Sequence, residues 1–160
     1  MNFAYKAARQ EAAPALYRLL SDGAVSRGAL GACAFPLAIL DASTKDRAVT
    51  YVNPAFERYF GHESADALGR SLAQLVFRGD EALWHRLLAQ PSSRWTLRAW
   101  TNDDDMRFVE LSLAALRGPD GRISHWVATF VDRGEIEKLR AELESLRNEV
   151  AALRQMPRAA

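Results

Sequence analysis

The side chains of this 160-residue sequence that could act as nucleophiles or metal ligands are few and scattered. There is one cysteine, Cys33, and the three histidines are His62, His85 and His125. No pair of them has the spacing of a zinc site or of an HExxH helix. The acidic run Asp103–Asp105 lies in a polar stretch, and three consecutive carboxylates there are typical of a solvated turn. We therefore predict no catalytic residue and no metal site.

The sequence carries none of the short motifs that mark common enzyme classes. It has no GxSxG nucleophile turn, no Walker-type phosphate loop and no GxGxxG dinucleotide motif. Its 21 Lys and Arg residues against 20 Asp and Glu residues give a net charge of +1, too small to neutralise several phosphates. We expect neither an enzyme nor a nucleic-acid-binding protein.

The composition is that of a globular domain with a helical extension. Hydrophobic residues make up 49% and charged residues 26%, which is enough apolar surface to close one core. The longest apolar run, 32–40, is about half of the ~20 residues that a membrane helix needs. The first residues lack the features of a secretory signal, and a single cysteine cannot form an internal disulfide. We expect a cytoplasmic chain with no membrane partner.

Residues 1–33 are predicted to form an N-terminal helical cap. This region is rich in alanine, and Pro14 and Gly23 interrupt it, so we expect two short helices. The apolar residues that a helix would place largely on one side are Leu16, Tyr17, Leu19 and Leu20.

Residues 34–133 are predicted to form an α+β core with a five-stranded antiparallel sheet. The expected strands are 36–40, 48–52, 95–101, 108–116 and 123–131. Short helices are expected at 55–60 and 80–90, between the second and third strands. Gly118–Gly121 reads as a hairpin turn. Val109, Leu111 and Leu113 alternate with polar residues, which indicates a sheet with one covered face.

Residues 134–156 have the clearest periodicity in the chain, and 157–160 are a short tail. Apolar residues fall at positions a and d of a heptad, namely Ile136, Leu139, Leu143, Leu146, Val150 and Leu153. The g positions carry Glu135, Glu142 and Glu149, and the e positions carry Arg140, Arg147 and Arg154. Opposite charges at g and e favour a parallel homodimer through a coiled coil. The alternative is an amphipathic helix that packs on its own sheet.

The core resembles a PAS domain, specifically its light-oxygen-voltage (LOV) branch. The similarity covers residues 34–133. It rests on VNPAF at 52–56, LGR at 68–70 and the strand sequences within 98–132. The resemblance implies a five-stranded antiparallel sheet with helices on one face, a pocket between them, and a signalling helix after the last strand.

The resemblance fails at the residues that LOV proteins use for flavin photochemistry. Their reactive cysteine lies in a GRNCRFLQ-like segment, and Gly69-Arg70 match it, but the cysteine position is Leu72. A carbon side chain cannot act as the thiol nucleophile. The family's two strand asparagines align with Trp100 and Glu110, and its final glutamine with Phe130. We expect no flavin, because these side chains remove hydrogen-bond partners of the ring.

Haem is the other cofactor that PAS domains bind, through a histidine on the helix before the third strand. His85 lies on that helix several residues past the usual ligand position, so we expect no haem. His62 and His125 are expected at the surface. Cofactor-site residues are therefore unknown, with Leu72, Val76, Trp100, Glu110 and Phe130 as pocket candidates.

Two functions follow from these patterns. The first is a dimeric sensor and relay module without cysteine photochemistry, which signals through its C-terminal coiled coil to an unknown downstream protein. The second is a sensor whose altered pocket holds a small apolar metabolite, haem or flavin. Between an occupied pocket and a core collapsed around large side chains, the sequence favours the collapsed core.

Overall fold

The computed structural model describes residues 23–90 and 94–155. The helices expected before residue 23, with Leu16, Tyr17, Leu19 and Leu20, and the tail at 157–160 lie outside this range. Within it, no helix combines the length and the apolar character needed to cross a bilayer. Nor do these residues gather three His, Cys, Asp or Glu side chains that could hold a metal ion.

A five-stranded antiparallel sheet organises the core, as predicted. The strand order is β2-β1-β5-β4-β3, and β4 and β5 form a long central hairpin. The strands are β1 (Leu37–Asp41), β2 (Val49–Val52), β3 (Arg94–Trp100), β4 (Met106–Arg117) and β5 (Ile123–Asp132). The predicted strand positions are therefore confirmed to within two residues of each end.

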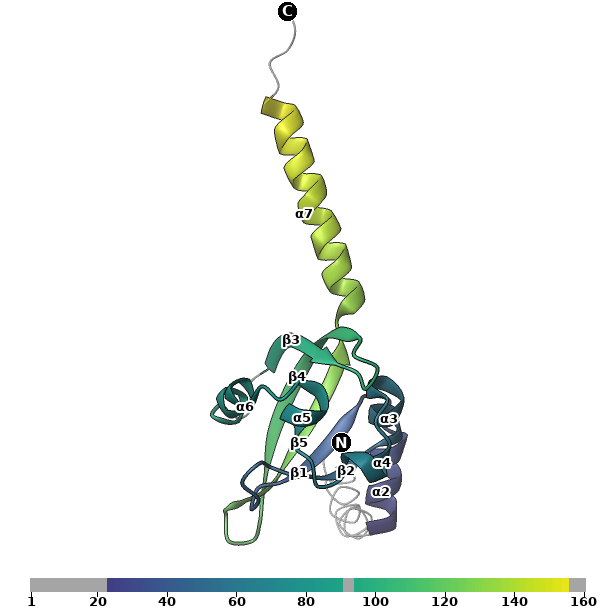
Figure 1. Ribbon diagram of the computed structural model, residues 1–160, viewed down its shortest axis with the longest axis vertical. Coiled ribbons are helices and arrows are strands. Elements are labelled where there is room, and N and C mark those ends of the chain that lie inside the picture. Colours follow the sequence, from purple (N-terminus) through teal and green to yellow (C-terminus); the bar gives the residue numbers. More distant parts are fainter. Residues whose placement is uncertain (1–22, 91–93, 156–160) are drawn as a thin grey trace, which may run out of the picture.

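Short helices cover one face of this sheet (Figure 1). They are α3 (Pro54–Phe60), α4 (Ser64–Ala67), α5 (Leu72–Val76) and α6 (Glu81–Leu88), and α2 (Gly23–Ala32) lies beside α3. Sequence analysis missed α4 and α5, because four or five residues are too few to show a helical period.

Side-chain caps explain where α3, α5 and α6 begin. The Asn53 side-chain oxygen accepts a hydrogen bond from Phe56 N–H, and Pro54 occupies the first turn of α3. Ser71 and Asp80 cap α5 and α6 in the same way. Gly61 ends α3 with φ +74°, a conformation that favours glycine. Local residue types thus set the chain reversals that bring α5 and α6 over the sheet.

The alternation along β4 separates a buried face from an open one. Val109, Leu111 and Leu113 are buried against the helices, whereas Glu110 and Ser112 are only half-buried on the other face. The same alternation in β5 directs Trp126, Ala128 and Phe130 inward. The core therefore lies between the sheet and α3–α6.

The last helix, α7 (Gly134–Gln155), leaves the core and extends away from the sheet (Figure 1). Its 22 residues correspond to a length of about 33 Å at ~1.5 Å per residue. Only its first turns contact β4. The intramolecular alternative, in which this helix packs on its own sheet, does not occur in this structure.

Candidate functional site

Three of the five pocket candidates meet inside the core. Leu72, Val76 and Phe130 are all 0% exposed and belong to one apolar cluster. The ring of Phe130 lies 5.0 Å from the ring of Phe60 and 6.0 Å from that of Phe56. This part of the interior, where β5 faces the helices, is filled by aromatic side chains.

The other two candidates do not join that cluster, and the assignment of both to the pocket requires correction. Glu110 lies on the open face of the sheet, where its carboxylate pairs with Arg133. Trp100, at the end of β3, lies on the opposite side of its strand from the buried Ala99. Arg78 stacks over the Trp100 indole, with its guanidinium carbon 4.8 Å from the ring centre.

An alignment error of one residue explains why Trp100 and Glu110 were assigned to the pocket. The residue before each of them, Ala99 in β3 and Val109 in β4, faces the interior and is 0% exposed. The side chain period of a strand is two, so a one-residue error reverses the face. The polar–apolar alternation of Val109, Glu110 and Leu111 was the signal that could have placed Glu110 outside.

The three histidines occupy different environments. His85 is exposed on α6, so it points away from the interior where a haem would sit. His125 is half-buried in β5, opposite Asp41. His62 is 7% exposed, and its Nε2–H donates to the Leu75 carbonyl at 2.9 Å. The expectation that His62 is a surface residue was wrong, because this hydrogen bond satisfies the ring inside the core.

Leu72 and Cys33 belong to different parts of the fold. Leu72 begins α5 and is fully buried, whereas Cys33 follows α2 and is partly exposed. The backbone carbonyl of Cys33 lies 3.3 Å from the side-chain nitrogen of Asn53, which donates to it. Leu72, which sequence analysis aligned with the LOV cysteine, therefore lies inside the core, and the backbone of Cys33 lies beside Asn53 at the start of α3.

Asn53 is a buried polar residue that sequence analysis included only within the VNPAF segment. It is 0% exposed, and its oxygen also accepts from Leu37 N–H at 2.9 Å. Its side-chain nitrogen donates to the Phe35 carbonyl at 2.9 Å. One side chain thus ties the start of β1 to the start of α3 and to the chain that follows α2.

The junction between β5 and α7 is held by charged side chains. Arg133, immediately before α7, donates to the Glu110 carboxylate on β4, and its backbone N–H donates to the Phe108 carbonyl at 2.8 Å. The Arg133 hydrogen bond is the main reason that the pKa of Glu110 lies below its ordinary value. Asp132 accepts from Gly134 N–H at 2.7 Å, a local turn immediately before α7.

Tyr59 on α3 lies near the same junction. Its hydroxyl is buried, and burial followed by the Asp132 carboxylate raises its pKa above the ordinary value. The Arg107 guanidinium carbon lies 5.8 Å from its ring centre. No motif in the sequence indicated Tyr59, because α3, β4 and the end of β5 meet only in the folded chain.

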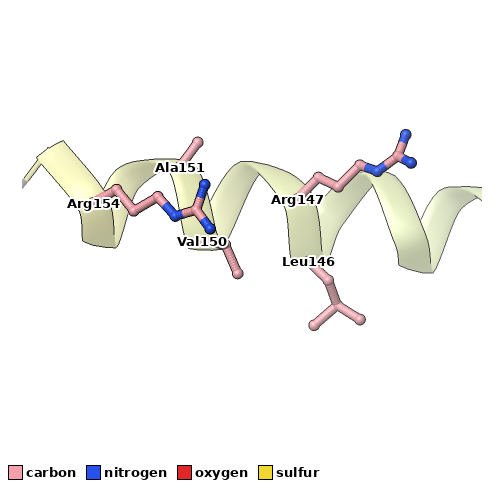
Figure 2. Close-up of a pocket in the computed structure, with 5 residues that line it drawn as sticks. All are labelled: Leu146, Arg147, Val150, Ala151 and Arg154. Carbon is pink, nitrogen blue, oxygen red and sulfur yellow. The ribbon is translucent and has the colours of Figure 1, made fainter.

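The heptad residues of α7 form an apolar row that the core does not cover. Their exposed fractions are Ile136 38%, Leu139 58%, Leu143 50%, Leu146 57%, Val150 46% and Leu153 63%. Figure 2 shows the distal part of this row, where Leu146 and Val150 project on one side of the helix and the Arg147 and Arg154 side chains leave it elsewhere. Contiguous exposed apolar residues of this kind are typical of protein–protein interaction surfaces.

Comparison with known proteins agrees with this architecture. No curated protein matches the sequence. An RNA-binding light-oxygen-voltage receptor of known structure has a TM-score of 0.68 and 25% identity, covering 81% of this chain. The match covers 38% of that receptor, so the present chain spans less than half of its length.

Two further solved structures are similar. The LOV domain of a blue-light activated histidine kinase from Erythrobacter litoralis EL346 has a TM-score of 0.54 at 25% identity, over 64% of this chain and 98% of that one. The LOV protein of Rhodobacter sphaeroides has a TM-score of 0.58 at 22% identity, over 68% and 64% of the two chains. A model of the PAS fold matches residues 32–138, which is more than half of the sequence, and the chain belongs to the PAS family.

Proposed function

We propose that this chain is a dimeric PAS sensor and relay module that lacks LOV cysteine photochemistry and signals through α7 to a downstream partner. The observation that carries the proposal is the apolar row of α7. Six large side chains at heptad positions are exposed, although the same types of residue are buried throughout the core. Full burial of one such side chain is worth about 1.5–3 kcal/mol, so a second helix is a strong candidate to cover the row.

The charges beside the row support a parallel arrangement. Glu142 and Glu149 occupy g positions, and Arg147 and Arg154 occupy e positions. In a parallel pair, each g carboxylate faces the e guanidinium five residues further along in the other chain. An antiparallel pair would lose this match. Each exposed pair contributes only about 0.2–1 kcal/mol, so the charges choose orientation more than they supply affinity.

The junction offers a route from the sheet to the helix. Because Arg133 is tied to Glu110 on β4, a displacement of β4 relative to β5 would change the direction in which α7 leaves the core. In a dimer, two such directions correspond to two arrangements of the helix pair. A signal that favours one arrangement would reach the partner through the far end of α7.

We propose further that the interior holds no flavin. Leu72 replaces the thiol nucleophile, and Phe130 packs against Phe56 and Phe60 where a ring system would need space. The inward positions Ala99 and Val109 have aliphatic side chains, which offer no hydrogen bond to a polar ring edge. An absorption spectrum of the purified protein tests this, since bands of flavin or of haem would contradict a closed core.

One observation favours the second candidate, a sensor of a small ligand. Trp84 on α6 is 1% exposed, and its indole N–H has no hydrogen-bond partner among the described residues. A buried donor without an acceptor costs about 1–3 kcal/mol, and a ligand acceptor would relieve this cost. Mass spectrometry of the native protein should then show a retained small molecule. If none is found, the ligand sensor is rejected and the relay module with a collapsed core is supported.

Sedimentation equilibrium tests the dimer directly. The variant with Leu143→Asp and Leu146→Asp places two carboxylates in the row and should be monomeric where the original chain is dimeric. The matched control carries Ser145→Asp and Asn148→Asp, which add the same charges on the other side of α7. This control should remain dimeric. An original chain that is monomeric at tens of micromolar would rule out the coiled-coil role.

A further inference from the structure

The edge of the sheet formed by β3 has an open ladder of backbone groups. β3 is the last strand in the order and pairs only with β4. Among the described residues, no backbone hydrogen bond from another element reaches it. Alternate residues of an edge strand leave their N–H and C=O groups unpaired, and such a row can accept a further strand.

The pairing of this edge strand is regular. The pairing of β3 with β4 continues over seven residues, from Arg94 to Trp100, without a register shift. The β1–β2 and β4–β5 pairs each contain one such shift. Bulges and prolines are common devices that keep an edge from pairing, and β3 has neither.

An apolar groove runs beside the same edge. It has a volume of about 310 Å³ and lies between α6 and β3, which flank each other at one side of the core (Figure 1). Its apolar lining comes from Leu83 and Leu87 of α6 and from Trp95 and Leu97 of β3. Leu83, Trp95 and Leu97 are only half-buried. Further apolar side chains could therefore be buried here.

One arginine lies at the groove and two more lie on the opposite face of β3. Arg86 lines the groove, and Arg94 and Arg98 are exposed on the side of β3 that faces away from it. The guanidinium carbon of Arg98 lies 5.9 Å from the ring centre of Phe108. A guanidinium nitrogen of Arg94 lies 3.9 Å from the Glu110 carboxylate, with which Arg133 also pairs. Arg94 and Arg98 thus place two guanidinium groups on this face of β3, with the Glu110 carboxylate beside Arg94.

We propose that the β3 edge binds an extended peptide segment of a partner protein in which apolar and acidic residues alternate. Added as a sixth strand, such a segment would send every second side chain into the groove beside Leu83 and Leu97. The intervening side chains would lie next to Arg94 and Arg98, where carboxylates form charge-assisted hydrogen bonds. The backbone ladder of this edge belongs to β3 and not to α7, although Arg94 shares the Glu110 carboxylate with Arg133 at the start of α7.

A simpler explanation of Arg94 and Arg98 is that their charges prevent the edge from pairing with another strand. It does not account for the apolar groove beside the edge or for the absence of a bulge. The two explanations predict different behaviour toward an acidic peptide. A guarded edge would bind none, whereas a receptor edge would select acidic over basic peptides.

The test uses the full chain and a fluorescein-labelled eight-residue peptide of alternating valine and aspartate, followed by fluorescence anisotropy. The variant R94E/R98E should weaken binding at least tenfold, whereas R70E/R122E, with the same change in charge far from β3, should alter it less than twofold. A peptide with lysine in place of aspartate should bind at least tenfold more weakly. A peptide N-methylated at alternate residues along one edge should also bind at least tenfold more weakly, because it cannot complete the ladder.

Changes in amide chemical shifts, measured by NMR, locate the peptide on the protein. On addition of the aspartate peptide, the changes should be confined to β3 and α6. No binding, equal binding of the lysine peptide, or unchanged binding by R94E/R98E would overturn the proposal. Changes centred on α7 would do the same. Protection of alternate β3 amides from hydrogen exchange in the protein alone would assign the edge to a second copy of the chain, which also contradicts a peptide site.

Discussion

The PAS core and α7 use the same kinds of apolar residue at equally regular spacing, yet they bury them to opposite extents. Phe60 and Leu111 are 0% exposed, whereas Leu139 and Leu153 are 58% and 63% exposed. The core closes because a sheet and four short helices face each other within one chain. A single projecting helix has no such facing surface. The apolar pattern of the core is thus satisfied within the chain, whereas that of α7 is left exposed.

The largest change in stability should come from truncating a buried aromatic side chain in the core. Phe60 contacts the rings of Phe56, Tyr59 and Phe130, so Phe60→Ala should lower the free energy of unfolding by about 3–5 kcal/mol in urea denaturation. The comparison variant is Leu146→Ala. It should change the free energy of unfolding of the monomer by less than about 0.5 kcal/mol. Equal losses for the two variants would show that α7 packs on its own core.

The next largest effect concerns a buried polar residue. Asn53→Ala removes a helix cap and leaves the Leu37 N–H without its acceptor, so the free energy of unfolding should fall by about 2–4 kcal/mol. Asn148→Ala, at a position of α7 away from the heptad row, should be nearly neutral in the same thermal or urea melts. A small loss at Asn53 would mean that the chain after α2 is not held through this side chain.

A smaller effect should appear in the dimer alone. Arg147→Glu with Arg154→Glu places like charges at facing g and e positions, which should weaken a parallel dimer by about 1–2 kcal/mol. Adding Glu142→Arg and Glu149→Arg to the same chain should restore the original dissociation constant, measured by sedimentation. Failure of the reciprocal exchange to rescue would argue against the parallel register.

The smallest effect should be a change in how stability depends on pH. The pKa of Glu110 is lowered in the folded chain, so its ionised form stabilises the fold above its ordinary value of 4.5 and this contribution disappears as the pH falls below that value. Glu110→Gln should therefore lose stability relative to the original chain at pH 7, and the difference should shrink toward pH 3. Urea titrations at several pH values measure it. A difference that does not vary with pH would show that the carboxylate charge has no role at the junction.

Sequence patterns predicted most of the fold because the relevant signals are local and repeated. The strands, the helices at 54–60 and 81–88 and the heptad of α7 all follow from periods of two or about 3.6 residues. The site was predicted less well. Leu72, Val76 and Phe130 do meet in the core, but the alignment placed Trp100 and Glu110 one residue from the positions that face inward. Short helices such as α5 carry too few residues to reveal their period.

The sequence by itself determined that the chain has one α+β core and a helix with a continuous apolar row, since these depend on residue type and spacing along the chain. Only the tertiary structure decided which side chains share a location. Three features bring together residues that are distant in sequence: the Arg133–Glu110 pair, the Asn53 hydrogen bonds and the groove between α6 and β3. The physical reason is that periodicity fixes the face of an element, whereas strand register and helix packing fix its neighbours.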